Sequence, residues 1–534
     1  MKRNYFVCGL LALFGSLNMQ AAVDFTVNGI NYSVTDSAVV SVAADSDNPY
    51  EGAINIPASV AYDGVDYAVT AVADKAFYYC TGVTSVTLPE GVTKLGYAAF
   101  RNCSGMTSVT LPSTLKKIGS AAFFGCKSLA GITIPAAVDS IKPYTFYGCE
   151  ALTSVNVPRS VVAVGGSAFY GCKELVSVVL PEGLTEIASY TFDNCQKLET
   201  VNIPGSVKQI GDYAFERCFS LGAISIPEGV TQIGTAAFYL CGLTSLSLPA
   251  SLQNITGSTF AGCLALQNIS VADGNAVYSA PAGSNAIIET IVDEKTQAVT
   301  YKLVAGCSNT VIPATVTEIG KYAFYDCIGL TSISIPASVL EVDAYAFSGC
   351  LNLKNVEISE GVQSIEEYAF RNCLSLESIE IPSTVTVISV GTFYGCGALK
   401  SVVLPATVTE VEDYAFTKCE SLADFVCLAE ACPKVTIDAF EDTAIENVAL
   451  RVPEAGLEAY ELHAVWGLFA SISGMTDGNN VAPNKDAETA IDNLKGDAKI
   501  VSVYNLGGQQ SARMQRGINV VRMSDGTTRK VLMQ

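Results

Sequence analysis

The sequence predicts a β-solenoid, a fold in which short coils of chain stack in one direction and bury their apolar sides against their neighbours. The main evidence is a fixed period: the pattern Phe-x-x-Cys occurs fourteen times, and eleven of the intervals between successive copies are 23 residues long. A hydrophobic content of 49%, against 16% charged residues, supplies enough apolar surface for an extended core. The copies begin at Phe77, Phe100, Phe123, Phe146, Phe169, Phe192, Phe215, Phe238, Phe260, Phe324, Phe347, Phe370, Phe393 and Phe416.

Each repeat also contains a segment with the pattern of a short strand. The unit reads Leu-x-x-Val-x-Leu-Pro-x-x-Val-x-x-Ile-Gly, followed by a small residue and Phe-x-x-Cys. In one copy Val109 and Leu111 alternate with Thr110, which is typical of a strand with one buried face. Pro112 then ends the strand at a place where a missing amide donor is tolerated, and Ser359 takes this place in a later coil.

Stacked coils are expected to pair these strands in parallel, with equivalent residues about 4.8 Å apart. Each Phe then stacks on the Phe of the coil above and of the coil below, and the rings fill the convex side. Coils inside the stack therefore depend on both of their neighbours.

The 18 cysteines of the chain raise the alternatives of disulfides, metal ligands and buried free thiols. The repeat cysteines occupy one position of the coil, so their Cβ atoms lie about a strand spacing apart, beyond the ~3.8 Å of a disulfide. A one-dimensional row also lacks the clustered ligands of a metal site. We therefore expect free thiols that act as small hydrophobes, whereas Cys427 and Cys432, in an irregular segment, are compatible with a local bridge or with two free thiols.

The first 21 residues have the pattern of a secretory signal peptide. Lys2 and Arg3 precede an apolar segment, and small residues follow at Ala21 and Ala22. Residues 1–21 are therefore predicted to be removed on export, with no transmembrane segment after cleavage. The formal net charge of −21 repels phosphate backbones, so nucleic acid is not an expected partner.

The centre of the chain divides into a cap, two runs of repeats and an insertion. Residues 22–70 are predicted to form an N-terminal β cap, because alternating segments flank Asn28-Gly29, a strong hairpin signal. The leucine-containing repeats cover 71–263 and 313–450. Between them, at 264–312, the period fails and turn residues predict an inserted hairpin or irregular repeat.

The C-terminal part is predicted to begin with a helical cap over residues 451–472, since apolar residues there recur at helical spacing. His463 and Trp466 within it are interpreted as packing residues. Residues 473–489 have linker composition, and residues 490–534 are predicted to form a small β module.

The repeat unit resembles the BspA-like leucine-rich repeat family, which is abundant in surface proteins of Bacteroidetes. The strand segment, the Ile-Gly step and the small-Phe-x-x-Cys element recur together and in order over about residues 50–450. The resemblance implies a curved, right-handed leucine-rich repeat solenoid that is secreted or held at the outer membrane, on the outer cell surface. It also implies adhesion, or binding of host or microbial macromolecules.

The end of the chain is similar to the C-terminal sorting domain of the type IX secretion route. The similarity lies in 503–509, 516–521 and 530–532, although the usual Gly-x-Tyr is Gly517-Ile518-Asn519 here. The alternative is a small β module that only ends the chain.

Little in the sequence suits catalysis, a metal or a cofactor, and none of these is expected. A single histidine removes most catalytic triads and zinc sites from consideration. Glu357 and Glu380 occupy outward strand positions one coil apart, but no apolar pocket is indicated that would raise the pKa of one of them. They are interpreted as solvated surface groups.

The outward strand positions are the better candidates for binding. Small hydroxyls, amides and carboxylates along a concave sheet can bind an extended polymer or a protein edge, although a merely solvated strand face is the alternative. The candidates are Thr87, Thr110, Thr133, Asn156, Asn202, Ser225, Ser247, Ser334, Glu357 and Glu380.

Three functions are compatible with these features. The first is non-enzymatic binding of an extracellular protein or polysaccharide by a monomer, through the concave strand face. The second is a structural spacer or scaffold on the cell surface. The third, which the scarcity of catalytic residues disfavours, is an enzyme with its site in 264–312.

Overall fold

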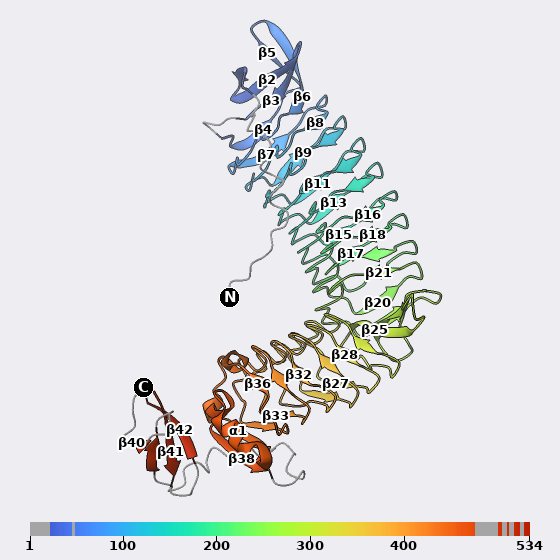
Figure 1. The fold of residues 1–534 in the computed structure, drawn as a ribbon. Coiled ribbons are helices and arrows are strands. Elements are labelled where there is room, and N and C mark those ends of the chain that lie inside the picture. Colours follow the sequence, from blue (N-terminus) through green and yellow to red (C-terminus); the bar gives the residue numbers. More distant parts are fainter. Residues whose placement is uncertain are drawn as a thin grey trace. The chain divides into compact units, whose positions relative to one another are not determined.

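The computed structural model describes residues 22–44 and 49–475 and the strands of the C-terminal module. The predicted signal peptide (1–21) and most of the predicted linker (473–489) lie outside the described residues. The chain divides into two compact units, Met1–Gly242 with Asn254–Thr256, and Leu243–Gln253 with Gly257–Gln534. Each unit is built from stacked coils (Figure 1), so the predicted β-solenoid is confirmed.

In most coils one strand contributes to the parallel ladder that the repeat predicted, although the segments 223–226 and 310–312 are not strands. Pairing shifts by 23 residues, as in Thr133 opposite Asn156, and alternate side chains form what we call the outward strand face. In the first unit these strands are β4 (Gly52–Asn55), β7 (Val83–Thr87), β9 (Ser108–Thr110), β11 (Gly131–Thr133), β13 (Ser154–Asn156), β15 (Ser177–Val178) and β17 (Thr200–Val201). In the second they are β20 (Ser245–Leu248), β22 (Asn268–Val271), β27 (Ser332–Ile335), β29 (Asn355–Ile358), β31 (Ser378–Glu380), β33 (Ser401–Leu404), β35 (Asp424–Cys427), β37 (Ala449–Pro453) and β38 (Ser471–Met475).

A second parallel ladder, which the sequence pattern did not predict, uses two-residue strands at the Ile-Gly step. Ile118 in one such strand is buried while Lys117 is exposed, and two residues are too few for an alternation to be recognised. In the first unit these strands are β8 (Lys94–Leu95), β10 (Lys117–Ile118), β12 (Ser140–Ile141), β14 (Ala163–Val164), β16 (Glu186–Ile187), β18 (Gln209–Ile210), β19 (Gln232–Ile233) and β21 (Asn254–Ile255). In the second they are β26 (Glu318–Ile319), β28 (Glu341–Val342), β30 (Ser364–Ile365), β32 (Val387–Ile388), β34 (Glu410–Val411) and β36 (Lys434–Val435).

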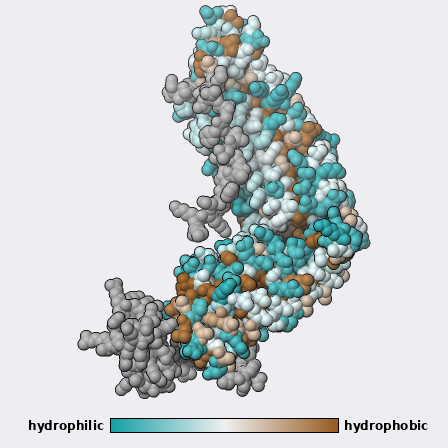
Figure 2. Space-filling model, in the orientation of Figure 1, coloured by the Kyte–Doolittle hydropathy of each residue, from teal (hydrophilic) through white to brown (hydrophobic). Residues whose placement is uncertain are grey.

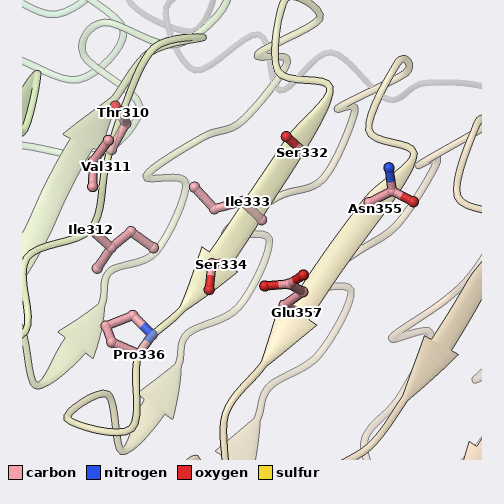
Figure 3. Close-up of a pocket in the computed structure, with 9 residues that line it drawn as sticks. All are labelled: Thr310, Val311, Ile312, Ser332, Ile333, Ser334, Pro336, Asn355 and Glu357. Atoms are coloured by element: carbon pink, nitrogen blue, oxygen red, sulfur yellow. The ribbon is translucent and has the colours of Figure 1, made fainter.

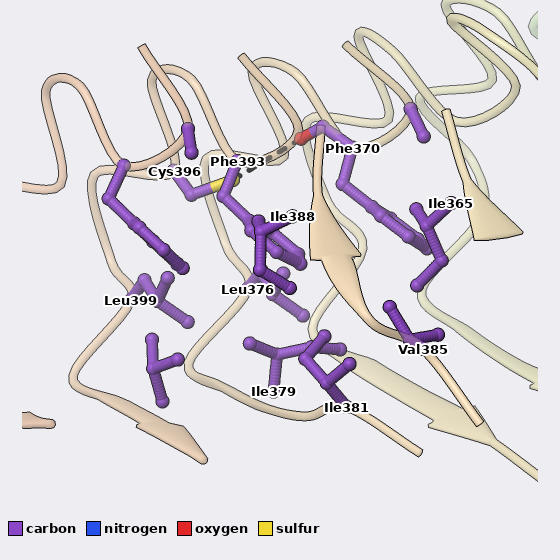
Figure 4. Packing of buried hydrophobic residues seen from close by; sticks show 14 of the residues in the cluster. Ile365, Phe370, Leu376, Ile379, Ile381, Val385, Ile388, Phe393, Cys396 and Leu399 are labelled. Carbon is purple, nitrogen blue, oxygen red and sulfur yellow. Dashed lines mark hydrogen bonds between the residues drawn. The ribbon is translucent and has the colours of Figure 1, made fainter. Parts of the chain in front are cut away.

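The third side of each coil, here called the turn side, carries Phe-x-x-Cys. Phe169 stacks between Phe146 and Phe192, with ring centroids 5.4 and 5.5 Å away. In the second unit Phe370 stacks on Phe393 at 5.7 Å (Figure 4). The predicted column of buried rings is therefore confirmed in both units.

The repeat cysteines are free thiols, as predicted, and all are buried except the half-buried Cys263 and Cys327. They are more than small hydrophobes, because most donate a hydrogen bond to the carbonyl oxygen of the Phe one coil earlier. The distance from Cys396 Sγ to the Phe370 oxygen is 3.2 Å (Figure 4). Cys427 and Cys432 are also free, which decides between the two alternatives that the sequence left open.

The turn side depends on two residues with left-handed backbone, two positions before and two positions after the Phe. Tyr144 before Phe146 has a φ of 61°, and Gly148 after it has a φ of 67°. This conformation directs amides toward the next coil, as in the bond of 2.7 Å from Gly148 N to the Tyr170 carbonyl. Each turn is thus hydrogen-bonded to the turn of its neighbour.

The N-terminal cap is a sheet of β1 (Phe25–Val27), β2 (Ile30–Asp36), β3 (Val39–Val42), β5 (Ser59–Tyr62) and β6 (Val65–Val72). The hairpin predicted around Asn28-Gly29 is confirmed, with Val27 opposite Ile30. β6 continues in parallel into the two-residue strand β8, so the cap covers the first coil. Tyr50 closes the ring column, since its centroid lies 4.7 Å from that of Phe77.

The predicted inserted hairpin in the second unit consists of β24 (Ala286–Val292) and β25 (Val299–Gly306), with β23 (Tyr278–Ser279) beside β24. β25 pairs in parallel with β26, as β6 does with β8 in the cap. The insertion therefore starts a new run of two-residue strands, as the N-terminal cap starts the run of the first unit. The chain of the inserted hairpin reverses direction at residues 293–298.

The predicted helical cap over residues 451–472 is helical only in η3 (Glu454–Gly456), the six-residue α1 (Leu457–Leu462) and η4 (Trp466–Leu468), and its ends belong to β37 and β38. The short helices η1 (Ile437–Phe440) and η2 (Ile445–Asn447) precede it. Phe440 extends the ring column, 5.8 Å from Phe416, and Trp466 packs on its edge. Trp466 Nε1 donates to the Pro433 carbonyl, and His463 Nδ1 accepts the Val465 amide. In the described parts of the chain, no helix has the length and apolar character needed to cross a bilayer.

The C-terminal module is an antiparallel sheet in the order β40-β39-β41-β42. Its strands are β39 (Ile500–Tyr504), β40 (Gln510–Ser511), β41 (Gly517–Met523) and β42 (Thr528–Met533). The strands predicted in this region from their alternation coincide with β39, β41 and β42.

Two carboxylates are buried on the turn side of the first unit. Asp193 is 2% exposed and Glu216 is 6% exposed. Arg217 lies 2.7 Å from the Glu216 carboxylate and 3.9 Å from Asp193, and Asp193 Oδ1 has no hydrogen-bond partner in the described chain. Burial and the negative charge of Glu216 raise the pKa of Asp193, and the positive charge of Arg217 lowers it. The net effect raises this pKa to about 8.

Truncation of a ring inside the column should be costly. We expect Phe169→Ala to lower the free energy of unfolding by about 3–5 kcal/mol, because a cavity opens between two neighbouring rings. Urea denaturation followed by circular dichroism measures this, with Phe169→Leu as the control that retains most of the volume. Equal stability of Phe169→Ala and the wild type would contradict the role assigned to the column.

The left-handed turn positions can be tested with a matched pair. At Gly148 an added Cβ meets no atom closer than 3.9 Å, whereas at Gly125 it would lie 2.2 Å from Asn102 Oδ1. Gly148→Ala should therefore cost only the backbone strain of about 1–2 kcal/mol, and Gly125→Ala should cost more. Equal urea midpoints for the two variants would count against this account of the turn.

Asp193 should make the stability of the protein depend on pH. An unfolded aspartate has a pKa of about 3.9, so between about pH 4 and pH 8 the folded state binds a proton that the unfolded state has lost, and stability falls as the pH rises. We expect Asp193→Asn to be stabilised relative to the wild type at pH 9 and less so at pH 5, as urea midpoints would measure. The control variant Glu199→Gln changes an exposed carboxylate and should keep the pH dependence of the wild type. If Asp193→Asn also kept that dependence, Asp193 would not be its source.

Candidate functional site

The ten predicted binding residues all have exposed side chains. Six lie in the first unit and four in the second, and the ladder brings some of them together as direct neighbours. Thr87 is opposite Thr110, and Ser334 is opposite Glu357. The structure thus provides short rows of polar side chains on the outward strand face of each unit.

One of these residues is already engaged within the solenoid. The Asn202 amide nitrogen donates to the Leu180 carbonyl at 3.0 Å, and its oxygen accepts the Leu180 amide at 2.7 Å. The side chain therefore continues the pairing of β17 beyond its last residue, which gives Asn202 a structural role in addition to its exposure.

The outward strand face differs in character from coil to coil. Val179 is 73% exposed at this position in the first unit, whereas Val403 in β33 is 3% exposed. Val403 occupies the position of its coil that Glu380 occupies in the coil before, and its burial removes it from the accessible surface. Elsewhere, Figure 2 shows hydrophobic side chains scattered in small groups among hydrophilic ones on the visible face.

A pocket of about 380 Å³ interrupts the outward strand face of the second unit. It lies where the segment 310–312, which is not a strand, runs beside β27 (Figure 3). The lining comes from three successive coils and contains two of the predicted binding residues. The lining residues are Thr310, Val311, Ile312, Ser332, Ile333, Ser334, Pro336, Asn355 and Glu357.

The pocket has one apolar side and one polar side. Val311 is 65% exposed at its edge, while Ser334 and Glu357 lie on the neighbouring strands β27 and β29. The Glu357 carboxylate extends from β29 toward β27 (Figure 3). It makes no hydrogen bond or ion pair within residues 22–44 and 49–475, whereas Lys354 of the same coil is paired with Glu377 at 2.9 Å.

Val311 was not among the predicted binding residues, although the sequence contains a signal for it. It precedes Pro313 by two positions, as Ser334 precedes Pro336. This correspondence is hard to recognise in the sequence, because the irregular segment 264–312 and not a regular coil precedes Pro313.

No metal centre is formed in the described part of the chain, where no group of three or more His, Cys, Asp or Glu side chains converges. His463 lies in the C-terminal cap, with its pKa lowered by burial. The buried carboxylates of Asp193 and Glu216 lie on the turn side, away from the outward strand face.

The family model of the BspA type leucine rich repeat region matches residues 70–199, 140–267, 185–310 and 294–423. Among solved structures, a leucine rich cell surface protein of Faecalibacterium prausnitzii is 29% identical; the match covers 76% of this chain and 94% of that one, with a TM-score of 0.49. A leucine-rich repeat protein of Bacteroides ovatus is 24% identical over 85% of this chain and 100% of that one, with a TM-score of 0.49.

The pneumococcal vaccine antigen PcpA is 17% identical over 86% of this chain and 98% of that one, with a TM-score of 0.42. No curated protein matches the chain. The family model covers more than half of the sequence, and its repeats coincide with the stacked coils of both units. The chain belongs to the family of BspA type leucine-rich repeat proteins.

Proposed function

We propose that this chain is a non-enzymatic, exported leucine-rich repeat protein that binds an extracellular macromolecule through its outward strand face. The observation that carries the proposal is the series of exposed hydroxyl, amide and carboxylate side chains at one position of successive coils. Because hydrogen-bonded ladders hold these coils in register, the backbone that carries the side chains is already ordered. Binding therefore costs little conformational entropy of the backbone.

A protein suits this face better than a polysaccharide. None of the ten outward residues is aromatic, and polysaccharides are commonly held by stacking of sugar rings on exposed aromatic faces. The aromatic rings of the turn side stack on one another, as Tyr147 does on Tyr170 at 4.4 Å. Ring faces that are occupied in this way are not free for sugars.

The cell surface is the proposed location. The predicted signal peptide would direct export, and the C-terminal module would act as a type IX sorting domain in a Bacteroidetes cell envelope. The antiparallel sheet of β39 to β42 is consistent with such a module. Surface protease accessibility in the native cell, before and after deletion of 490–534, tests this placement.

A spacer on the cell surface is the second candidate, favoured by the ring columns that run from Phe77 to Phe238 and from Phe324 to Phe440. Such a column gives a stiff rod whether or not its outer face binds anything. The two candidates differ in what substitutions on the outward strand face should do.

Thr133→Arg with Asn156→Arg places two large cations on the outward strand face of the first unit. For ligands identified on an array of extracellular matrix proteins and glycans, we expect binding to weaken about tenfold or more, as surface plasmon resonance would measure. The matched control is Thr185→Arg with Gln209→Arg. Thr185 immediately precedes β16 and Gln209 lies in β18, so both exposed side chains belong to the two-residue ladder and not to the outward strand face. This control should bind as the wild type does. Unchanged binding by the first variant, or silence of the whole array, would favour the spacer.

A further inference from the structure

The pocket between 310–312 and β29 differs from the rest of the outward strand face in its charge and its shape. Of its nine lining residues, Glu357 is the only charged one. Its volume of about 380 Å³ lies within the range of about 300–1,000 Å³ typical of small-ligand pockets. A single side chain of a partner can therefore enter it.

We propose that this pocket is the anchoring subsite for an arginine side chain of a protein partner. The inference rests on the proposed binding function and specifies the chemistry of the partner. The aliphatic part of the arginine lies along Val311 and Ile312, and its guanidinium meets the carboxylate of Glu357.

The charge of the pocket selects a cation. The Glu357 carboxylate has no partner in the described chain, and Glu380, one coil further, adds a second exposed negative charge. Lys354, in the coil of Glu357, and Lys400, two coils further on, lie 2.9 and 4.0 Å from the Glu377 carboxylate. An anionic or phosphate-bearing ligand would meet only repulsion here.

The arrangement of acceptors favours arginine over lysine. The guanidinium presents five N–H donors in a planar fork, whereas an ammonium is a compact point charge. The Ser334 hydroxyl is adjacent to Glu357 across the strand pair, and Ser332 is adjacent to Asn355. A carboxylate flanked by hydroxyl and amide oxygens on two strands can accept several of these donors at once.

The apolar edge explains why a bare divalent cation does not suit the pocket. Val311 is 65% exposed and Ile312 lies below it (Figure 3). A metal ion would find a single carboxylate and no other charged ligand, which is too few for calcium. A long side chain with an apolar stem and a charged end matches both parts.

The test is a selection from a phage-displayed library of random peptides on the full-length protein. Enriched sequences are synthesised with the original arginine, with lysine and with citrulline, which keeps the shape and loses the charge. Affinities are measured by fluorescence anisotropy against the wild type, Glu357→Gln and Glu420→Gln. Glu420→Gln is the matched control, since it removes the same charge from an exposed side chain outside the pocket.

We expect the enriched peptides to share an arginine, and both citrulline and Glu357→Gln to weaken binding roughly tenfold to a hundredfold. Lysine should be intermediate, and Glu420→Gln should bind as the wild type does. No enrichment, enrichment without a basic residue, or equal binding to Glu357→Gln would each overturn the proposal.

The failure of this inference can be told apart from that of the proposed function. If Thr133→Arg with Asn156→Arg weakens ligand binding and Glu357→Gln does not, the outward strand face binds without this subsite. If only Glu357→Gln weakens binding, the subsite stands and the wider face does not take part.

Discussion

The structure depends on one constraint: the Phe rings inside the column are buried because the coils before and after each of them place a ring against its two faces. Phe169 has neighbours at 5.4 and 5.5 Å, and a coil with a different rise would separate them. The constant repeat length keeps this contact in register from coil to coil. The same need explains the ends, where Tyr50 lies on Phe77 and Phe440 lies on Phe416.

The turn that carries the ring satisfies its own polar groups through the next coil. Left-handed residues on either side of the Phe direct amides along the stack, and the cysteine thiol donates to the Phe carbonyl of the coil before it, as in Cys149 to Phe123 at 3.2 Å. Cysteine suits this position because it is small, apolar enough for the core and still a weak donor. Burial raises the pKa of the Cys149 thiol, and the neutral form is the one that donates.

Most of the fold could be predicted from the sequence because a pattern that occurs fourteen times makes the inward positions visible. The ring column, the strand before most of the prolines, the hairpin at Asn28-Gly29 and the short helix α1 of the C-terminal cap follow from patterns in the sequence. The two-residue ladder and the thiol hydrogen bonds could not be predicted, since neither leaves a pattern of its own. The candidate site was predicted in part: the position of Glu357 follows from the repeat, but the pocket arises where the insertion replaces a regular strand.

The division between inward and outward positions also explains how such a protein can acquire binding specificity. Inward residues are held to Phe, Cys, Leu, Val and Ile by the register of the stack, whereas the outward position holds Thr110, Asn156, Val179, Ser334 and Glu357 without change to the ladder. Asp193 and Glu216 illustrate the opposite case, since carboxylates on the turn side become buried and their pKa values rise. The outward carboxylates of Glu357 and Glu380 remain in water, whereas those of Asp193 and Glu216 do not, so charge can vary at little energetic cost on the strand face. The pocket beside Glu357 adds the apolar edge of Val311 to such a charge.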